Sequence, residues 1–504
     1  MNHNPTSAGL PGFKRYVELL AWVVVIVTIL CIPLKILQLG YLPADDALRH
    51  AAKAVSGKSW SEILILNQTY QIDHEYGWNL LLEKIYQWTH WNAEALVIFS
   101  VVGLFVLWGW AVLPWLRRPE AWLAAILVTT VAADAPVRFL TGRPYTISSA
   151  AVMALLLLWQ RFGTAPPRKW MLLFMALLVA VSTYFHGVWY LWLLPVFAFL
   201  LAEQFRWGVS LFFCWIAGVA FGSLLTGHPV AYPWQAWQLA KMAVGMHATA
   251  RTMAVELTPS GDGEGVMALI LLGGLVVTRQ LVNLKGFSLL KNPAFWLAAM
   301  SWVLAFKVKR FMYDWGWPAL LVLVTCELEL LLLARMAADG VRRLILVLGL
   351  AAAVFLCLTS DSDSRWSGTL VKTHLSATNP ALAGWMPDHG GIFYTADMSL
   401  FYDTFFTNPN GDWRYLLGFE PTWMPKDDFE VYHKILWNFG DSQAYEPWVR
   451  KMKPADRLAI GGGRGARPQI PELEWNYGVS GIWIGRLPRT DAPATNVVAP
   501  APNR

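Results

Sequence analysis

Charge is scarce in this sequence. Only 15% of its 504 residues are Asp, Glu, Lys or Arg, against roughly 25% in soluble domains. Hydrophobic residues make up 56% of the chain, and many of them stand in long apolar runs. This composition excludes an ordinary soluble protein and predicts a polytopic α-helical membrane protein.

Cysteine is also scarce, and its four residues all lie in apolar runs: Cys31, Cys214, Cys326 and Cys357. No disulfide framework and no metal-binding spacing is visible. The glycine-rich stretch 461–467 lacks the lysine and the following Ser or Thr of a nucleotide-binding P-loop, so it predicts only a flexible loop. The net charge of +6 is interpreted as loop charge that sets orientation in a membrane, and no nucleic-acid partner is expected.

About eleven apolar segments approach or reach the length of a membrane-crossing helix. They lie at 16–38, 92–115, 120–134, 145–160, 170–185, 187–203, 207–225, 266–280, 293–306, 315–335 and 341–358. With a cytoplasmic N-terminus, every inner loop carries Lys or Arg, as the positive-inside rule requires, and the C-terminus lies outside. We therefore expect a cytoplasmic tail at 1–15 and a transmembrane domain at 16–358, with long outer loops at 39–91 and 226–265.

Composition changes near residue 360, where charge, Gly and Pro rise and the long apolar runs stop. Strand-like pieces at 391–395 and 482–485 flank helical pieces such as 429–437. This pattern predicts a small extra-cytoplasmic domain of α/β or α+β class at 359–488. The last residues, 489–504, are rich in Ala and Pro and are expected to be disordered.

Two adjacent carboxylates, Asp45 and Asp46, follow the first apolar run and therefore lie at a membrane surface. A helical pattern at 46–56 comes next, and one face of it carries Asp46, Arg49, His50 and Lys53. In a structural interpretation, Asp45 caps this helix and Asp46 favours its positive end. In a catalytic interpretation, one acid is a general base with cations beside it. The two interpretations are compatible.

Basic residues on the expected outer face run against the positive-inside bias and need a reason. They are Arg49, Arg138, Arg143, Lys307, Lys309 and Arg310. A phosphate or pyrophosphate at the outer leaflet would explain their convergence, because cations stabilise its charge. Snorkelling to lipid headgroups is the alternative.

Further polar candidates on this face are Asp73, His74, Glu75 and Asp134. The first three could bind sugar hydroxyls or supply metal ligands. Asp134 stands at the outer end of an apolar segment, where an acid is a functional candidate; a local pair with Arg138 is the alternative. Participation of a divalent metal is left open, and its ligands, if it is present, would be Asp46, Asp134 and His74.

An acidic pair in a long first outer loop resembles the GT-C superfamily of membrane glycosyltransferases. That group includes the protein O-mannosyltransferases, the aminoarabinose transferases of lipid A and the catalytic subunit of oligosaccharyltransferase. The stretch 45–50 is similar to their acidic-pair motif, and 309–313 with Pro318 resembles a basic-aromatic stretch that opens a late crossing. The likeness covers roughly residues 20–360 in architecture. The Lys-Pro-Pro element of the aminoarabinose transferases and the Trp-Trp-Asp signature of oligosaccharyltransferases are absent, so the subfamily stays open.

The resemblance implies an inverting transferase that moves a sugar from a polyprenyl-phosphate donor to a hydroxyl of a glycan, lipid or protein. The reaction would take place at the periplasmic face of a bacterial inner membrane. Asp45 or Asp46 would be the base, and Asp45 is favoured because the first acid usually takes that role in the family. Asp46 would then orient Arg49 or His50, and the outer cations would hold the donor phosphate. The residues expected to contact substrate are His50, Asp73, His74, Glu75, Asp134 and Tyr313.

Two other functions stay open: a polysaccharide polymerase or ligase of another fold, and a flippase of lipid-linked sugars. Neither requires paired carboxylates at the outer end of the first crossing. A transporter would place charges or broken helices near the membrane midplane. The expected crossings are almost free of charge, with Glu327 and Glu329 as exceptions, and this favours an enzyme with its site at the membrane surface.

Overall fold

The computed structural model describes the chain except residues 1–10, 43–45, 69–71, 134, 164, 246–258, 261, 283–287, 336–339, 371–373, 439–440, 462–466, 479–480 and 489–504. Asp45, Asp134 and the expected disordered tail therefore lie outside the described residues. The chain divides into two compact units. The helical unit is Met1–Gly57 with Ile72–Val371, and the sheet unit is Lys58–Gln71 with Lys372–Arg504.

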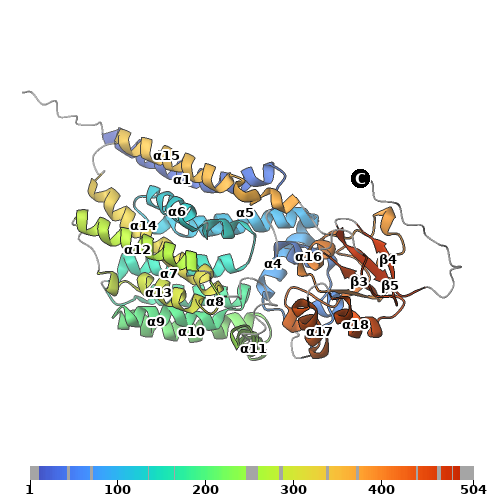
Figure 1. Cartoon of the computed structure of the whole chain (residues 1–504). Helices are drawn as coiled ribbons and strands as arrows, with labels where there is room; N and C mark the ends of the chain where they lie inside the picture. The colour runs from blue at the N-terminus through green and yellow to red at the C-terminus, as the bar shows by residue number, and fades with distance from the viewer. Residues whose placement is uncertain are drawn as a thin grey trace, which may run out of the picture. The chain divides into compact units, whose positions relative to one another are not determined.

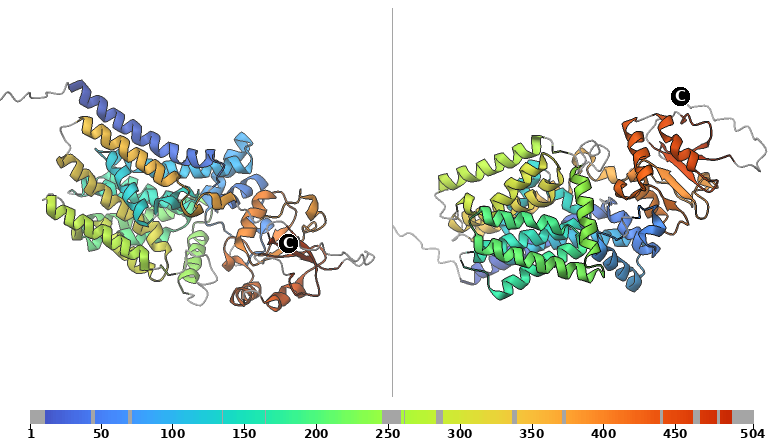
Figure 2. Two further views of the ribbon diagram at one scale, coloured as in Figure 1. Left: turned by 45° about the horizontal axis from the view of Figure 1, so that its top comes forward. Right: turned by 90° about the horizontal axis from the view of Figure 1, so that it is seen from below.

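Helices build almost all of the helical unit (Figure 1). They are α1 (Pro11–Gln38), α2 (Asp46–Ser56), α4 (Tyr76–Thr89), α5 (Ala93–Ala111), α6 (Glu120–Ala133), α7 (Tyr145–Phe162), α8 (Lys169–His186), α9 (Leu193–Leu201), α10 (Phe205–Leu225), α11 (Ala231–Gly245), α12 (Asp262–Val282), α13 (Pro293–Ala305), α14 (Trp317–Arg335) and α15 (Gly340–Thr359). A π-helical turn, Met312–Gly316, leads into α14. The first and the last of these helices, α1 and α15, lie side by side (Figures 1 and 2).

Seven helices in the described part of the chain are long and apolar enough to cross a membrane. They are Arg15–Gln38, Ala93–Trp115, Lys169–His186, Phe205–Leu225, Gly265–Val282, Met312–Ala334 and Gly340–Thr359. Three shorter apolar helices are Glu120–Ala133, Trp189–Leu201 and Pro293–Ala305. Every expected crossing thus falls on a helix, but the length and hydropathy of only seven support a crossing, so the count of eleven stays a prediction. The chain is a helical membrane protein.

The centre of the helical unit is α7, which is buried along its whole length from Tyr145 to Trp159. It is apolar on all sides, as a helix surrounded by other helices should be. Tryptophan contributes to the same core: Trp108 packs against Trp122 with ring centroids 5.0 Å apart, and against Phe139 at 4.5 Å. Tryptophan rings therefore fill the interior as well as the membrane interface that usually attracts them.

Small residues bring α10 against α8. A Cβ atom on Gly218 would lie 2.6 Å from the carbonyl oxygen of Ala176, and one on Gly222 would lie 2.6 Å from that of Ala180. Two glycines four residues apart allow two helix backbones to touch, as in other membrane helix pairs. This contact fixes the position of α8, and with it His186 at the end of α8.

The sheet unit contains a mixed five-stranded sheet with the strand order β2-β1-β3-β5-β4. Its strands are β1 (Ile392–Thr395), β2 (Arg414–Tyr415), β3 (Arg457–Ile460), β4 (Glu474–Tyr477) and β5 (Trp483–Arg486), and its helices include α16 (Met398–Thr407), α17 (Lys426–Trp437) and α18 (Glu446–Lys451). Strand β1 is parallel to β2 and β3, whereas β5 is antiparallel to β3 and β4. The strand-like pieces at 391–395 and 482–485 fall on β1 and β5. A small sheet near the C-terminus is therefore present.

Part of the expected first outer loop belongs to the sheet unit. The amide of Ile65 donates to the carbonyl of Tyr415 at 2.9 Å, and Asn67 donates likewise to Trp423 at 2.6 Å. The ring of Trp60 lies 4.7 Å from that of Phe419. The stretch 39–91, expected as one loop, is thus divided between two units.

Candidate functional site

Helix α2 begins at Asp46 and turns its charged face into the protein. Its side chains Arg49 and His50 are 2% and 0% exposed. The helix ends where Gly57 adopts a left-handed conformation at φ +65° and donates its amide to the carbonyl of Lys53. Glycine tolerates this conformation at the end of a helix. The face expected from the sequence is therefore a buried one, and its charges need partners inside the protein.

Arg49 supplies the central contact of this face. Its Nε lies 3.1 Å from Oδ1 of Asp46, and its Nη2 donates to Oε2 of Glu75. A second cation reaches Asp46 from another segment, because Nε of Arg143 lies 3.5 Å from Oδ2 of Asp46. Asp46 is 21% exposed and Arg143 17%. This carboxylate is thus shared by two guanidinium groups at a partly open position.

The turn before α4 completes the arrangement, which we call the acid cluster: Asp46, Arg49, His50, Asp73, His74, Glu75, Asn79 and Arg143. The amide nitrogen of Asn79 donates to Oδ2 of Asp73 at 2.5 Å, so its oxygen, 2.6 Å from Nδ1 of His50, is the acceptor. Nδ1 of His50 is therefore the donor. The other ring nitrogen, Nε2, lies 3.1 Å from Oε2 of Glu75. Oxygen atoms thus face both ring nitrogens of a fully buried histidine.

A second group, the arginine cluster, consists of Arg138, Tyr145, Ser148, His186, Lys309, Arg310, Tyr313 and Asp314. Asp314 joins two cations: Nε of Arg310 donates to its Oδ2 at 2.8 Å, and Nη2 of Arg138 lies 3.6 Å from its Oδ1. Nη2 of Arg310 also lies 3.2 Å from Nε2 of His186. Since the guanidinium only donates, Nε2 of His186 is the acceptor and Nδ1, 3.3 Å from the hydroxyl of Ser148, carries the proton.

Aromatic rings hold the guanidinium of Arg138 in place. It lies 4.5 Å from the ring centroid of Tyr313 and 5.1 Å from that of Tyr145. Tyrosine faces attract such a cation without neutralising it. Lys309 lies against Tyr313 in the same way, with Nζ 4.9 Å from the ring centroid. Arg138 and Lys309 thus both lie against the ring of Tyr313.

Tight backbone approaches determine where these side chains lie. Gly142 has φ +69°, and a Cβ atom there would lie 3.0 Å from Cβ of Ala47, so the loop that carries Arg143 rests directly on α2. Gly187 has φ +70°, and a Cβ there would lie 2.6 Å from the carbonyl of His74. Both positions require glycine, because a side chain would be strained and would also collide.

Helix α11 holds the 72–75 turn from the other side. The side chain of Gln235 accepts from the amide of Ile72 at 3.0 Å and donates to the carbonyl of the same residue. The hydroxyl of Tyr232 lies 2.8 Å from the carbonyl of His74 and 2.7 Å from that of Thr183. Each contact is made to a backbone group, so α11 orients the turn without binding the charged side chains of the turn.

Charge partners control the ionisation of the acid cluster. Burial raises the pKa of the Asp46 carboxyl, but Arg49 and Arg143 outweigh burial and hold that pKa well below its usual range. Burial likewise raises the pKa of Glu75, and Arg49 and His50 reverse the effect. Burial lowers the pKa of His74, and this effect outweighs that of the nearby Glu75 carboxylate, which raises it.

Most of the residues expected from the sequence meet in these two clusters. They are Asp46, Arg49, His50, Asp73, His74, Glu75, Arg138, Arg143, Lys309, Arg310 and Tyr313. Lys307 is different, because it is exposed and no described contact joins it to either cluster. His50 and Glu75, expected to contact substrate, are almost completely buried, and their described contacts are with protein groups. These contacts help to hold Arg49 in place, and substrate binding by the two residues stays a prediction.

The sequence alone assigned no role to five residues of the clusters: Asn79, Tyr145, Ser148, His186 and Asp314. Asp314 stands four residues after Arg310, a spacing at which an acid and an arginine meet on one helix face. Asn79 follows Glu75 at the same spacing. His186 ends an apolar helix, and its contact with Arg310 from a distant segment connects it to the site.

Among the described residues, no group of three or more His, Cys, Asp and Glu side chains could hold a metal ion. Of the three ligands expected for a metal, Asp46 and His74 are described, whereas Asp134 lies outside the described residues. The carboxylate of Asp46 contacts guanidinium groups.

The chain matches no protein-family model, and a comparison with curated proteins finds no significant relative. Its function must therefore be argued from the clusters themselves.

Proposed function

We propose that this protein is an inverting glycosyltransferase of the GT-C type, which moves a sugar from a polyprenyl-phosphate donor to an acceptor hydroxyl. The reaction takes place at the end of the helical unit that carries the acid and arginine clusters. The observation that carries the proposal is the presence of two carboxylates near the ends of apolar helices, each bound by partly exposed guanidinium groups. Arg143 binds Asp46, and Arg138 and Arg310 bind Asp314. Such a site binds a lipid-linked phosphate and can accept a proton.

The membrane topology is part of the same proposal. Eleven crossings, a cytoplasmic N-terminus and the positive-inside rule place both clusters and the sheet unit outside the cytoplasm. A donor with a polyprenyl chain would then approach through the outer leaflet of a bacterial inner membrane. The acceptor, a glycan, lipid or protein, comes from the periplasm.

The chemistry needs a base and a cationic site for the leaving group. The acceptor oxygen attacks the anomeric carbon, its proton passes to a carboxylate, and the carbon–oxygen bond to the phosphate breaks. The phosphate leaves with the bonding electron pair, and guanidinium groups stabilise the added charge. Arg143, Arg138 and Arg310 are the suitable cations, because each is partly exposed while bound to an acid.

The roles of the two aspartates differ. Arg49 and Arg143 hold the pKa of Asp46 low, so its carboxylate is a weak base. This supports Asp46 as a positioning residue for Arg49 and Arg143. We assign the base to Asp45, which stands beside it in the sequence and lies outside the described residues.

The test is a transfer assay on purified full-length protein in nanodiscs, with radiolabelled polyprenyl-phosphate sugars and cell-envelope acceptors. Asp45→Asn should abolish transfer, and Asp46→Asn should reduce it. Glu94→Gln is the matched control, because Glu94 is an exposed acid at the start of α5, away from both clusters.

A fully active Asp45→Asn variant would refute the assignment of the base. If no donor gives a covalent product but labelled lipid crosses the bilayer of reconstituted vesicles, the flippase is the correct function. Among the described residues, no observation supports a flippase, because the two acids inside the expected tenth crossing both bind other groups of the protein. Glu327 forms a bidentate pair with Arg279, and Glu329 accepts from backbone amides.

A further inference from the structure

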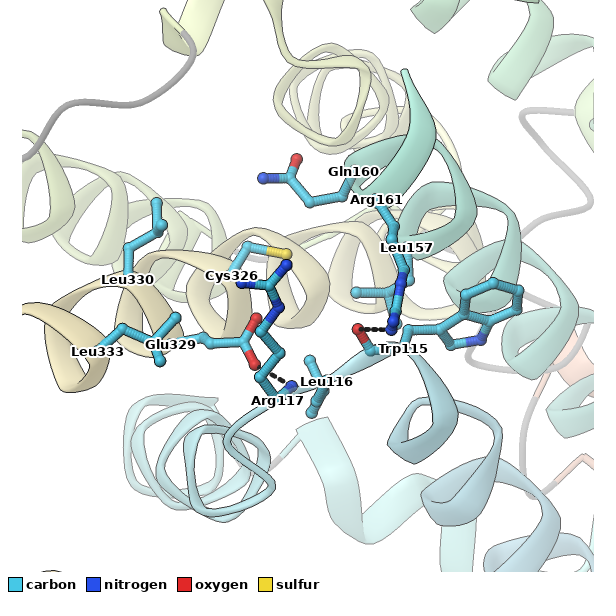
Figure 3. Close-up of a pocket in the computed structure, with 10 residues that line it drawn as sticks. All are labelled: Trp115, Leu116, Arg117, Leu157, Gln160, Arg161, Cys326, Glu329, Leu330 and Leu333. Atoms are coloured by element: carbon cyan, nitrogen blue, oxygen red, sulfur yellow. Dashed lines mark hydrogen bonds between the residues drawn. The ribbon is translucent and has the colours of Figure 1, made fainter. Parts of the chain in front are cut away.

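A cavity of about 620 Å³ lies at the other end of the helical unit, between α7, α14 and the short segment before α6 (Figure 3). It is lined by Trp115, Leu116, Arg117, Leu157, Gln160, Arg161, Cys326, Glu329, Leu330 and Leu333. Ligand sites in proteins commonly have volumes of roughly 300–1,000 Å³. The cavity is thus large enough for a small molecule or for part of a lipid.

The cavity is separate from the proposed transferase site. Helix α7 contributes Tyr145 to the arginine cluster and Leu157 to the cavity. At 1.5 Å per residue, these positions are about 18 Å apart along the helix axis. The π-helical turn and α14 repeat this separation with Asp314 and Cys326. No residue is shared between the two sites.

The walls combine two kinds of chemistry. Four leucines and Trp115 form the apolar part, and the exposed cations Arg117 and Arg161 form the polar part. Figure 3 shows the guanidinium of Arg117 beside Cys326 and that of Arg161 near Trp115. Nη1 of Arg161 lies 3.4 Å from the carbonyl of Trp115, a long contact that leaves donor capacity for another acceptor.

The one acid in the wall, Glu329, offsets only one of the two cations, so the wall keeps a net positive charge. Oε1 of Glu329 accepts from the backbone amides of Arg117 at 2.5 Å and Arg118 at 2.9 Å. This clamp fixes the loop and separates its two arginines. The side chain of Arg118 turns inward to Glu120, at 3.4 Å, whereas that of Arg117 lines the cavity.

We propose that this cavity binds an anionic phospholipid of the adjacent leaflet, with its phosphate at Arg117 and Arg161 and an acyl chain against the leucines. The wall offers contacts both to the phosphate and to the acyl chain of such a lipid. Arginine is well suited to phosphate oxygens, and α14 is long and apolar enough to lie in the membrane where the chain would enter. A water-soluble phosphate would use the cations and leave the leucines without a partner. The inference does not depend on the transferase activity or on the orientation of the termini.

Cys326 lines the cavity, so its reactivity can report whether the cavity is occupied. We would use full-length protein in which Cys31, Cys214 and Cys357, the other free cysteines, are replaced by serine. The rate of Cys326 alkylation by N-ethylmaleimide is measured in nanodiscs of phosphatidylcholine, with and without phosphatidylglycerol. A third sample contains phosphatidylcholine with inorganic phosphate in solution. Native mass spectrometry of the same samples counts the phosphatidylglycerol retained.

We expect phosphatidylglycerol to slow alkylation several-fold and to remain bound in the mass spectrum, while inorganic phosphate has little effect. Arg117→Gln with Arg161→Gln should weaken this binding by roughly 30-fold, from about 1 kcal/mol for each basic residue at an anionic surface. Arg168→Gln is the matched control, because Arg168 is an exposed arginine outside the cavity wall.

Three results would overturn the inference. Equal protection by inorganic phosphate would assign the cavity to a free anion. Protection by phosphatidylglycerol that survives the double substitution would place the lipid elsewhere on the protein, and the absence of both protection and retained lipid would leave the cavity without this ligand. None of these results bears on sugar transfer, so failure here and failure of the transferase proposal are distinguishable.

Discussion

Both ends of the helical unit contain arginine–carboxylate pairs, but they use them differently. At the end with the cavity, Glu120 is 1% exposed and accepts from Arg343 at 2.8 and 3.1 Å and from Arg118. At the other end, carboxylates and guanidinium groups form two clusters with histidines among them, and several members are partly exposed. Buried and closed pairs hold helices together, whereas open and shared ones can accept a ligand.

Removal of the closed pair should have the largest effect. Glu120→Ala leaves two buried guanidinium groups without their acid, and we expect a loss of about 3–5 kcal/mol in stability. The midpoint of thermal unfolding in detergent measures it. Glu120→Met together with Arg343→Met should recover part of the loss, because it removes the charge of Arg343 but keeps that of Arg118. An unchanged midpoint for Glu120→Ala would show that the two ends do not differ in this way.

Glu75→Gln tests the open end with the same chemistry. Arg49 keeps Asp46 as its partner, so the expected loss is smaller, about 1–3 kcal/mol. The transfer rate should fall by more than the loss of folded protein accounts for, because the guanidinium of Arg49 loses its fixed position. Unfolding midpoints and transfer rates measured on the same preparation separate the two effects. Equal losses for Glu75→Gln and Glu120→Ala would contradict the comparison.

Gly142→Ala should have a moderate effect, and Gly57→Ala provides its control. Both glycines have φ near the left-handed region, at +69° and +65°, and alanine there costs about 1–2 kcal/mol. The surroundings of the two glycines differ. A Cβ atom on Gly142 would lie 3.0 Å from Cβ of Ala47, whereas one on Gly57 would have no neighbour within 4 Å. Gly142→Ala should therefore also move Arg143 from Asp46 and lower transfer, while Gly57→Ala should change stability alone. Unfolding midpoints and transfer rates of both variants provide the measurement.

The smallest effect concerns pH. The folded-state pKa of His74 is lowered, so the unfolded chain binds more protons and stability falls as pH drops below about 6.5. His74→Gln should flatten this part of the profile. The lowered pKa values of Asp46 and Glu75 act at lower pH, since their contribution is complete above about 4 and is lost below it. Unfolding midpoints between pH 4 and 8 measure the effect of His74, and midpoints below pH 4 measure that of the two carboxyls. Identical profiles between pH 4 and 8 for wild type and His74→Gln would contradict the first effect.

Some of the structure could be read from the sequence because the signal is local. The apolar runs locate helices, and Asp46 to Gly57 contains both a helix face and its stop signal. Strand-like pieces near 391 and 482 fall on β1 and β5. Apolar runs locate helices better than they count membrane crossings, because α6, α9 and α13 are apolar but short.

The sequence by itself determined that this is a helical membrane protein with a small sheet near its C-terminus, since hydropathy and composition suffice for both. It also determined which polar side chains stand at helix ends. Only the tertiary structure decided their partners: Arg49 with Glu75, Arg143 with Asp46, and Arg310 with His186. It also decided that residues 58–68 pack in the sheet unit and that Glu329 clamps a loop from another segment. Each of these contacts joins segments far apart in the chain, and their pairing depends on helix packing and glycine approaches that no local pattern encodes.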